Sequence, residues 1–267
     1  MKKAERFISF AEARFNEEQA YRYYPKTREG FCLMMPALLR SAVFSLGTPC
    51  GMVDKTFPVA RFDSIDVSSD GSVQYKGPQL GQFHKRVVLG LLKLAEGALG
   101  DVTLDFHANT FLEGIGRDVC TANVEVLRNT VADLRTGTFI LRNYPLDRGC
   151  AFGFVSAVEW DRRKFTVSMD RRAASALAEK RNSFLWMVTR NRLADGLQTA
   201  LFDLFFATRQ FDYRLADLAA IWGREVKEFG RDARRALDTM YKLGALSEYE
   251  CSRGRIKVKT MLPFPRL

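Results

Sequence analysis

The fold is decided by residues 214–260, which read RLADLAAIWGREVKEFGRDARRALDTMYKLGALSEYECSRGRIKVKT. Apolar residues first recur with the 3.6-residue period of a helix and then alternate as they do in strands. The pattern predicts a short helix, a turn, a longer helix ended by Gly244, and two strands: Arg214–Ile221, Trp222-Gly223, Arg224–Leu243, Ala245–Glu250 and Arg255–Thr260. This order is that of a helix-turn-helix followed by a β-hairpin wing.

The part of the chain before this stretch predicts a similar order of elements. Asp70-Gly71 interrupts alternating apolar positions at 60–74 and predicts a hairpin turn there. The elements expected after it are a helix (His84–Ala95), a strand (Val102–Phe106), a short helix (Ala108–Ile115), a longer helix ended by Gly137, three strands (Thr138–Arg142, Ala151–Trp160 and Phe165–Met169), a strand (Phe184–Val188) and a helix (Arg192–Ala207).

We therefore predict an α+β fold with two tandem winged-helix domains. Residues 1–35 are expected to form an N-terminal arm, residues 36–170 the first winged-helix domain and residues 171–267 the second. The 267 residues, of which 47% are hydrophobic, suffice for two domains of ordinary size with cores of their own.

The positive charge of the chain is concentrated in its last two fifths. Lys and Arg number 41 against 31 Asp and Glu, a net charge of +10. Residues 1–159 contain 19 basic and 18 acidic side chains, whereas residues 160–267 contain 22 and 13. A one-sided excess of this kind favours a polyanionic partner, which charge alone does not identify as nucleic acid or a membrane surface.

The helix predicted at 224–243 has one apolar and one basic side. At 100° per residue, its apolar stripe consists of Val226, Phe229, Ala233, Leu237 and Met240. The opposite side carries six cations: Arg224, Lys227, Arg231, Arg234, Arg235 and Lys242. A DNA major groove admits one helix, and Arg and Lys bind base edges and phosphates there. The hairpin after the helix adds three predicted DNA contacts: Arg253, Arg255 and Lys257. The alternative is a solvated helix face without a ligand.

The long helix of the first predicted domain has a nearly neutral exposed side, which includes Glu125, Asn129 and Asp133. Its electrostatic attraction to DNA is therefore expected to be weak. We predict that this domain contacts DNA mainly through its basic hairpin turn: Arg162, Arg163 and Lys164. The alternative is that this domain mediates contacts with proteins.

Several functional classes lack the residues they need, so we expect no enzyme, no cofactor and no metal site. The two histidines, His84 and His107, belong to no H-x-H or H-E-x-x-H arrangement, and no phosphate-binding glycine-rich loop occurs. Tyr23-Tyr24 is expected to have a packing role. The five widely spaced cysteines are expected to be reduced and mostly packed. With no apolar run long enough for a membrane span and no signal peptide, we expect a cytoplasmic protein.

The sequence also resembles a known family, the initiators of iteron-controlled plasmid replication, and most of all their TrfA-like type. The resemblance begins at residues 35–44 (MPALLRSAVF), continues at residues 75–80 (YKGPQL) and persists from Tyr213-Arg214-Leu215 through the helix-turn-helix. It spans roughly residues 35–260 and leaves residues 1–34 unassigned.

The resemblance implies two winged-helix domains that bind direct repeats in the double-stranded DNA of a plasmid origin. It also implies melting of an adjacent AT-rich segment, recruitment of the host helicase and sliding clamp, and a change between homodimers and monomers. The family's recognition-helix role would fall on Arg224, Lys227, Arg231, Arg234 and Arg235.

Together these observations predict a plasmid replication initiator that binds origin repeats and opens the origin without enzymatic activity. The alternative function is that of a winged-helix transcriptional repressor. A third class is an interaction module whose basic face meets an acidic protein or a membrane and has no preference among DNA sequences.

Overall fold

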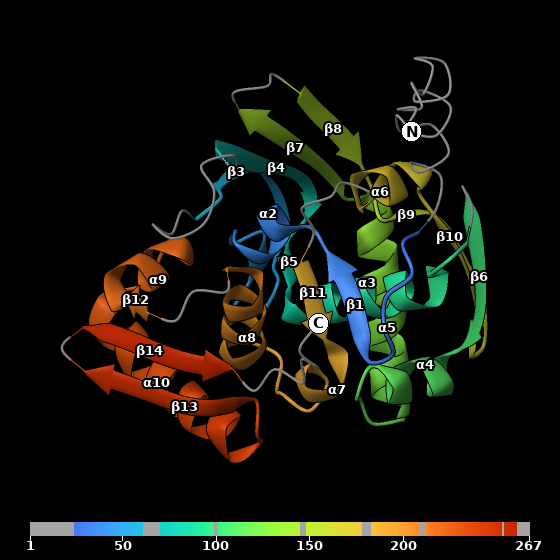
Figure 1. Ribbon diagram of the computed structural model, residues 1–267. Coiled ribbons are helices and arrows are strands. Elements are labelled where there is room, and N and C mark those ends of the chain that lie inside the picture. Colours follow the sequence, from blue (N-terminus) through green and yellow to red (C-terminus); the bar gives the residue numbers. More distant parts are fainter. Residues whose placement is uncertain are drawn as a thin grey trace, which may run out of the picture.

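The computed structural model describes residues 24–60, 70–98, 101–144, 148–177, 183–208, 212–252 and 254–260. The fold is α+β, as predicted, with helices and several small sheets (Figure 1). We refer to the two predicted domains as the first half (36–170) and the second half (from 171). No helix in the described ranges is long and apolar enough to cross a membrane.

The second half follows the predicted order closely. Its elements are α8 (Leu197–Thr208), β12 (Asp212–Arg214), α9 (Leu215–Ile221), α10 (Val226–Lys242), β13 (Leu246–Ser252) and β14 (Arg255–Thr260). β14 lies between β12 and β13 in an antiparallel sheet. Ile256 and Val258 alternate with exposed cations along β14 and are buried on the side of the helices. The strand β12 was missed because it has only three residues.

The first half has the same order of elements, with additional strands between them. Its elements are α3 (Gln82–Ala95), β6 (Val102–His107), α4 (Ala108–Gly114), α5 (Thr121–Thr136), β9 (Val155–Asp161) and β10 (Lys164–Met169). β10 lies between β6 and β9, again in an antiparallel sheet. The buried residues of α5 include all four apolar residues of the predicted helical pattern: Val124, Leu127, Val131 and Leu134.

A four-stranded antiparallel sheet is inserted into the first half. It consists of β3 (Met52–Pro58), β4 (Asp70–Pro78), β7 (Thr138–Tyr144) and β8 (Arg148–Phe152) in the order β3-β4-β7-β8. The predicted strand 151–160 is therefore two strands in two different sheets. The chain leaves the inserted sheet at Gly153-Phe154, where the buried Phe154 ring packs edge-on against Phe139 and Phe152. Three short elements lie before α3: α2 (Pro36–Leu39), β2 (Phe44–Ser45) and β5 (Leu80–Gly81).

The hairpin predicted at Asp70-Gly71 forms at a different place. Asp70 and Gly71 begin strand β4 and pair with Tyr144 and Asn143 of β7. The hairpin joins β3 to β4, and most of the connection between them, residues 61–69, lies outside the described residues. Asp-Gly favours turns locally, but pairing with β7, which is distant in sequence, holds these two residues in a strand.

Two elements near the junction of the halves are shorter than predicted. β11 (Ser183–Trp186) gives way to the short helix α7 (Met187–Arg190), so the predicted strand 184–188 ends early. Residues 192–196 form turns rather than the start of α8. A helix there would use the carbonyl groups of Asn191 and Leu193, but both carbonyls accept hydrogen bonds from Arg86.

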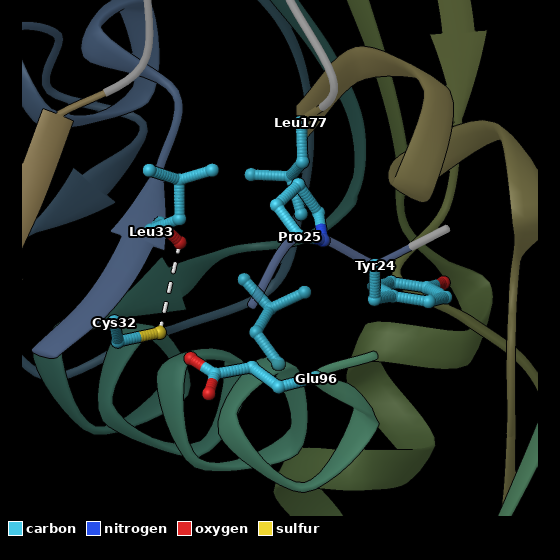
Figure 2. A pocket seen from close by; sticks show the side chains of 7 residues that line it. Tyr24, Pro25, Cys32, Leu33, Glu96 and Leu177 are labelled. Atoms are coloured by element: carbon cyan, nitrogen blue, oxygen red, sulfur yellow. Dashed lines mark hydrogen bonds between the residues drawn. The ribbon is translucent and has the colours of Figure 1, made fainter. Parts of the chain in front are cut away.

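The described part of the predicted arm is packed into the molecule. β1 (Phe31–Met34) pairs with β11 of the second half. Tyr24, Cys32 and Leu33 line a small pocket together with Glu96 of the α3 end and Leu177 of α6 (Arg171–Leu177), as Figure 2 shows. The buried Tyr24 hydroxyl donates a hydrogen bond to the Asp170 carbonyl at 2.8 Å, which agrees with a packing role for this tyrosine. Tyr23 lies outside the described residues.

The five cysteines are free, but not all of them are packed. Cys32 is buried, and desolvation raises the pKa of its thiol to about 12. Cys150 and Cys251 are partly buried against the core, so three of the five thiols are packed, in line with the prediction, whereas Cys50 and Cys120 are exposed. Cys120 precedes α5, and its sulfur accepts a hydrogen bond from the Asn123 N–H. Its position before the helix, which sequence spacing did not indicate, accounts for its exposure.

Candidate nucleic-acid interface

The helix α10 is held by its apolar side and presents the opposite side to solvent. Phe229, Ala233, Leu237 and Met240 are completely buried against α8, α9 and β13, as predicted. Val226 was predicted in the same stripe but is 42% exposed. It is the first residue of the helix, so its side chain lies beyond the edge of the core.

Four cations on the exposed side of α10 make no ion pair with any residue that the structure describes: Lys227, Arg234, Arg235 and Lys242. Exposed cations of this kind would attract a polyanion to this side of the helix. The helical spacing predicted this surface, and these side chains are exposed as expected.

The acidic residue Asp232 modifies the N-terminal part of this surface. Arg224 lies two residues before α10, not within it, and donates to Asp232 Oδ2 at 2.9 Å. Arg231 Nε lies 3.7 Å from the other oxygen of the same carboxylate. The hydrogen bond from Arg224, and then the charges of Arg224, Arg231 and Arg235, lower the pKa of Asp232 against the opposing effect of desolvation. The carboxylate therefore engages two of the five predicted α10 contacts.

The hairpin β13–β14 carries its cations on the outer face of the sheet. Arg255 donates to Asp212 Oδ1 at 3.0 Å, and Lys257 lies 3.8 Å from Glu250. Both cations alternate with the buried Ile256 and Val258, so they point away from the helices that cover the inner face. Arg253, which lies between β13 and β14 in the sequence, is outside the described residues.

The basic turn of the first half is docked on its own helix-turn-helix. Ala108 N donates to the Arg163 carbonyl at 2.8 Å, and Arg163 Nη1 donates to Asn109 Oδ1 at 2.9 Å. Arg162 has a φ of 50°, in the left-handed region. These contacts fix the backbone of the turn, and the side chains of Arg162 and Lys164 remain exposed.

Sequence analysis did not identify Arg128 of α5 as part of this surface. Its guanidinium binds Glu125 at 2.8 Å and donates to the carbonyl of Arg162, so it links the helix to the basic turn. The only signal in the sequence was its position one residue before Asn129 on the predicted exposed side.

The two basic surfaces belong to different parts of the molecule. In Figure 1, α10 lies at the lower left, and α4, which contacts the basic turn 162–164, lies at the lower right.

No family model and no curated protein match this sequence. The chain is similar in fold to domains 2–3 of RctB. A crystal structure of these domains (RctB-155-483) has a TM-score of 0.57 and 11% sequence identity, over 84% of this chain and 96% of that chain. A second structure, of selenomethionine derivatives of RctB domain 2 and domain 3, has a TM-score of 0.55 and 10% identity, over 85% and 99%. At these identities the likeness concerns the fold.

Proposed function

We propose that this protein is a replication initiator that binds repeats in the double-stranded DNA of a plasmid origin through two winged-helix domains. The observation that carries the proposal is the exposed side of α10, where four cations lack ion-pair partners among the described residues. The apolar side of α10 is buried, and the β13–β14 hairpin follows it. This arrangement matches that of winged-helix proteins, in which a recognition helix enters the major groove.

Two further findings support the proposal. The order of helix, strand, two helices and hairpin occurs in both halves, each with a three-stranded antiparallel sheet. The fold is similar to that of domains of RctB, a replication initiator, and the sequence resemblance to plasmid initiators points in the same direction. The proposed DNA contacts are the predicted ones, with Lys227, Arg234 and Arg235 foremost because they are exposed and unpaired within the described residues.

The proposed mechanism requires no catalytic residue and no cofactor. Binding energy collected over many phosphates would offset the cost of deforming and opening adjacent AT-rich DNA. The protein would act in the cytoplasm, with the host helicase, the sliding clamp and a homodimeric form as the partners that the family resemblance implies.

The proposal is tested by selecting bound duplexes from a random pool at near-physiological salt. We expect a defined motif, and an affinity for it that falls steeply as salt increases. Next to repeats of that motif, AT-rich DNA should become reactive to single-strand reagents when the protein binds. A motif without such opening would favour the repressor, and no enriched motif would exclude both functions.

A further inference from the structure

The two halves of the molecule meet at a cluster of charged side chains that is largely shielded from water. The first half contributes Lys85 and Arg86, adjacent residues of α3, and the second half contributes Arg190, Asp195 and Asp203. We call these five residues the interdomain clamp. Lys85, Arg86, Arg190 and Asp203 expose at most 3% of their side chains, and Asp195 exposes 14%.

Asp203 is the centre of one part of the clamp. Arg190 of α7 donates to its two oxygens from Nε at 2.7 Å and from Nη2 at 2.9 Å. Lys85 Nζ lies 2.7 Å from Asp203 Oδ2. Burial alone would raise the pKa of Asp203, but Arg190 and Lys85 hold this pKa below its usual value. Asp203 lies on α8, so a single carboxylate joins α3 of one half to α7 and α8 of the other.

Arg86 is the centre of the other part. Its Nε donates to Asp195 Oδ1 at 2.7 Å, and its Nη2 donates to the Leu193 carbonyl at 2.6 Å. Its Nη1 donates to the carbonyls of Ile115, at 2.9 Å, and Asn191, at 3.1 Å. Ile115 belongs to the turn between α4 and α5, and Asn191 to the segment before α8. Arg86 thus joins the helix-turn-helix of the first half to the segment 191–195 of the second half, which precedes α8.

The geometry of these contacts permits little sliding between the halves. A guanidinium has its donors in a planar, rigid fork, and each nitrogen of the Arg86 guanidinium has an acceptor. Buried ion pairs add little net stability compared with apolar packing, but a small displacement would leave charges in the interior without partners. The β1–β11 pairing also joins the predicted arm to the second half close to α7.

We infer that the interdomain clamp holds the two halves as one rigid body, so that the protein accepts DNA contacts from both halves at one fixed spacing only. The inference rests on the proposed function, because spacing matters only if both halves contact the duplex. Arg86, Lys85 and their partners would thus be positioning residues that contribute to specificity without touching DNA.

The rigid arrangement is tested first in the free protein, without DNA. Spin labels are attached to Cys120, which is exposed before α5, and to a Lys242→Cys variant at the end of α10, with Cys50, Cys150 and Cys251 replaced by serine. We expect a single narrow distance distribution between the two labels. A broad or multiple distribution would overturn the inference, whatever the protein binds.

The clamp is then loosened by Asp195→Asn, which removes the charge that Arg86 and Arg117 share while keeping the shape of the side chain. We expect the distance distribution to broaden. The matched control is Asp54→Asn, which removes an exposed ion pair with Lys76 on the inserted sheet. If Asp195→Asn stays as narrow as the control, the clamp is not what fixes the halves.

The inferred fixed spacing of the DNA contacts is tested on the duplex obtained by selection. Insertions of 1, 2, 5 or 10 base pairs are placed between the two segments that the wild-type protein protects in a footprint. Each insertion should weaken wild-type binding about tenfold or more, as the loss of one half's base contacts would. Ten base pairs restore the helical phase but move the contacts one turn apart, so a rigid protein should not recover. Recovery at ten base pairs, unchanged affinity throughout, or a single protected segment would overturn the inference. If no motif is selected, the proposed function fails, and the label distances alone decide the rigidity of the clamp.

Discussion

At the scale of single residues, Asp232 engages two of the cations that the proposed function assigns to DNA. In the free protein it binds Arg224 and lies close to Arg231. Helical spacing alone could not show that Arg224, eight residues before Asp232, reaches this acid. The bond exists because Arg224 precedes the helix, which frees its side chain to run along the helix edge.

Asp232→Asn is expected to increase the affinity for random duplex about fivefold, since a unit charge about 4 Å away in water changes the energy by about 1 kcal/mol. It should also steepen the salt dependence by about 0.9 in log K against log salt, because Arg224 becomes free to bind one more phosphate. Titrations of a random duplex at several salt concentrations measure both effects.

The control for this variant is Glu228→Gln, which removes an exposed acid that has no ion-pair partner among the described residues. It should raise affinity without steepening the salt dependence. Equal slopes for the two variants would mean that Arg224 does not become a phosphate contact.

Gly116, in the turn between α4 and α5, is required by both its backbone and its surroundings. It has a φ of +72°, and a Cβ there would lie 2.3 Å from the Asn191 carbonyl oxygen. We expect Gly116→Ala to lower the free energy of unfolding by about 1–3 kcal/mol through the backbone alone, and further through the clash. Urea unfolding measures the change.

Gly114, two residues earlier, is the matched control, since a Cβ there meets no atom within 4 Å. Gly114 is the last residue of α4, where alanine is a better helix former than glycine. The Gly114→Ala variant should therefore have an unchanged free energy of unfolding or one that is higher by up to about 1 kcal/mol. Similar losses for both variants would contradict the close approach of the turn to Asn191.

At the scale of elements, the start of α3 is sensitive to pH through His84. Gly81 N donates to His84 Nδ1 at 3.1 Å, so the neutral ring carries its proton on Nε2, which lies 3.1 Å from Asp133 Oδ2. Protonation of Nδ1 would break the bond to Gly81. Burial lowers the pKa of His84 below 6.5, and the opposing effects of Asp133 are smaller.

This pKa shift predicts that stability falls as pH decreases below 6.5. Above that pH the ring is neutral in both states and contributes nothing. Below it, the unfolded chain binds a proton that the folded chain excludes, until the pH reaches the folded pKa. Unfolding free energies from pH 7.5 to 5.5 should decrease by at most about 1.4 kcal/mol per pH unit. His84→Gln should remove this slope, whereas the exposed His107→Gln should keep it; the reverse would contradict the assignment.

Local patterns predicted three helices of each half and the hairpin after α10, because helical periodicity depends on residues close in sequence. They missed the short helices α2, α6 and α7. They did not predict the inserted sheet, in which β4 pairs with β7 across α3 and α5. The exposed side of α10 was predicted correctly for Lys227, Arg234 and Arg235. The pairing of Arg224, Arg255 and Lys257 with acids depends on tertiary geometry, and their DNA contacts stay a prediction.

At the scale of the whole molecule, the interdomain clamp could not be recognised from sequence. Lys85 and Arg86 precede the apolar run of α3, and adjacent cations near a helix start are usually solvated. Only the tertiary fold buries them and supplies their carboxylate partners, Asp195 just before α8 and Asp203 on α8. The ion pairs of the clamp therefore lie in the interior of the junction between the halves. Removing one partner of a buried ion pair lowers the free energy of unfolding far more than removing one partner of an exposed pair.

Asp203→Leu should therefore lower the free energy of unfolding by about 3–5 kcal/mol, because Lys85 and Arg190 would remain buried without their carboxylate. The triple variant Lys85→Met, Arg190→Met and Asp203→Leu removes all three charges together and should regain most of this loss, since well-packed apolar side chains replace buried ions at little cost. Urea unfolding of both variants measures the difference. If the triple variant is no more stable than Asp203→Leu, the loss comes from altered packing around α8 and not from unpaired charge. If it recovers stability but its label distances broaden, the charges serve to fix the geometry of the two halves, which apolar packing alone does not do.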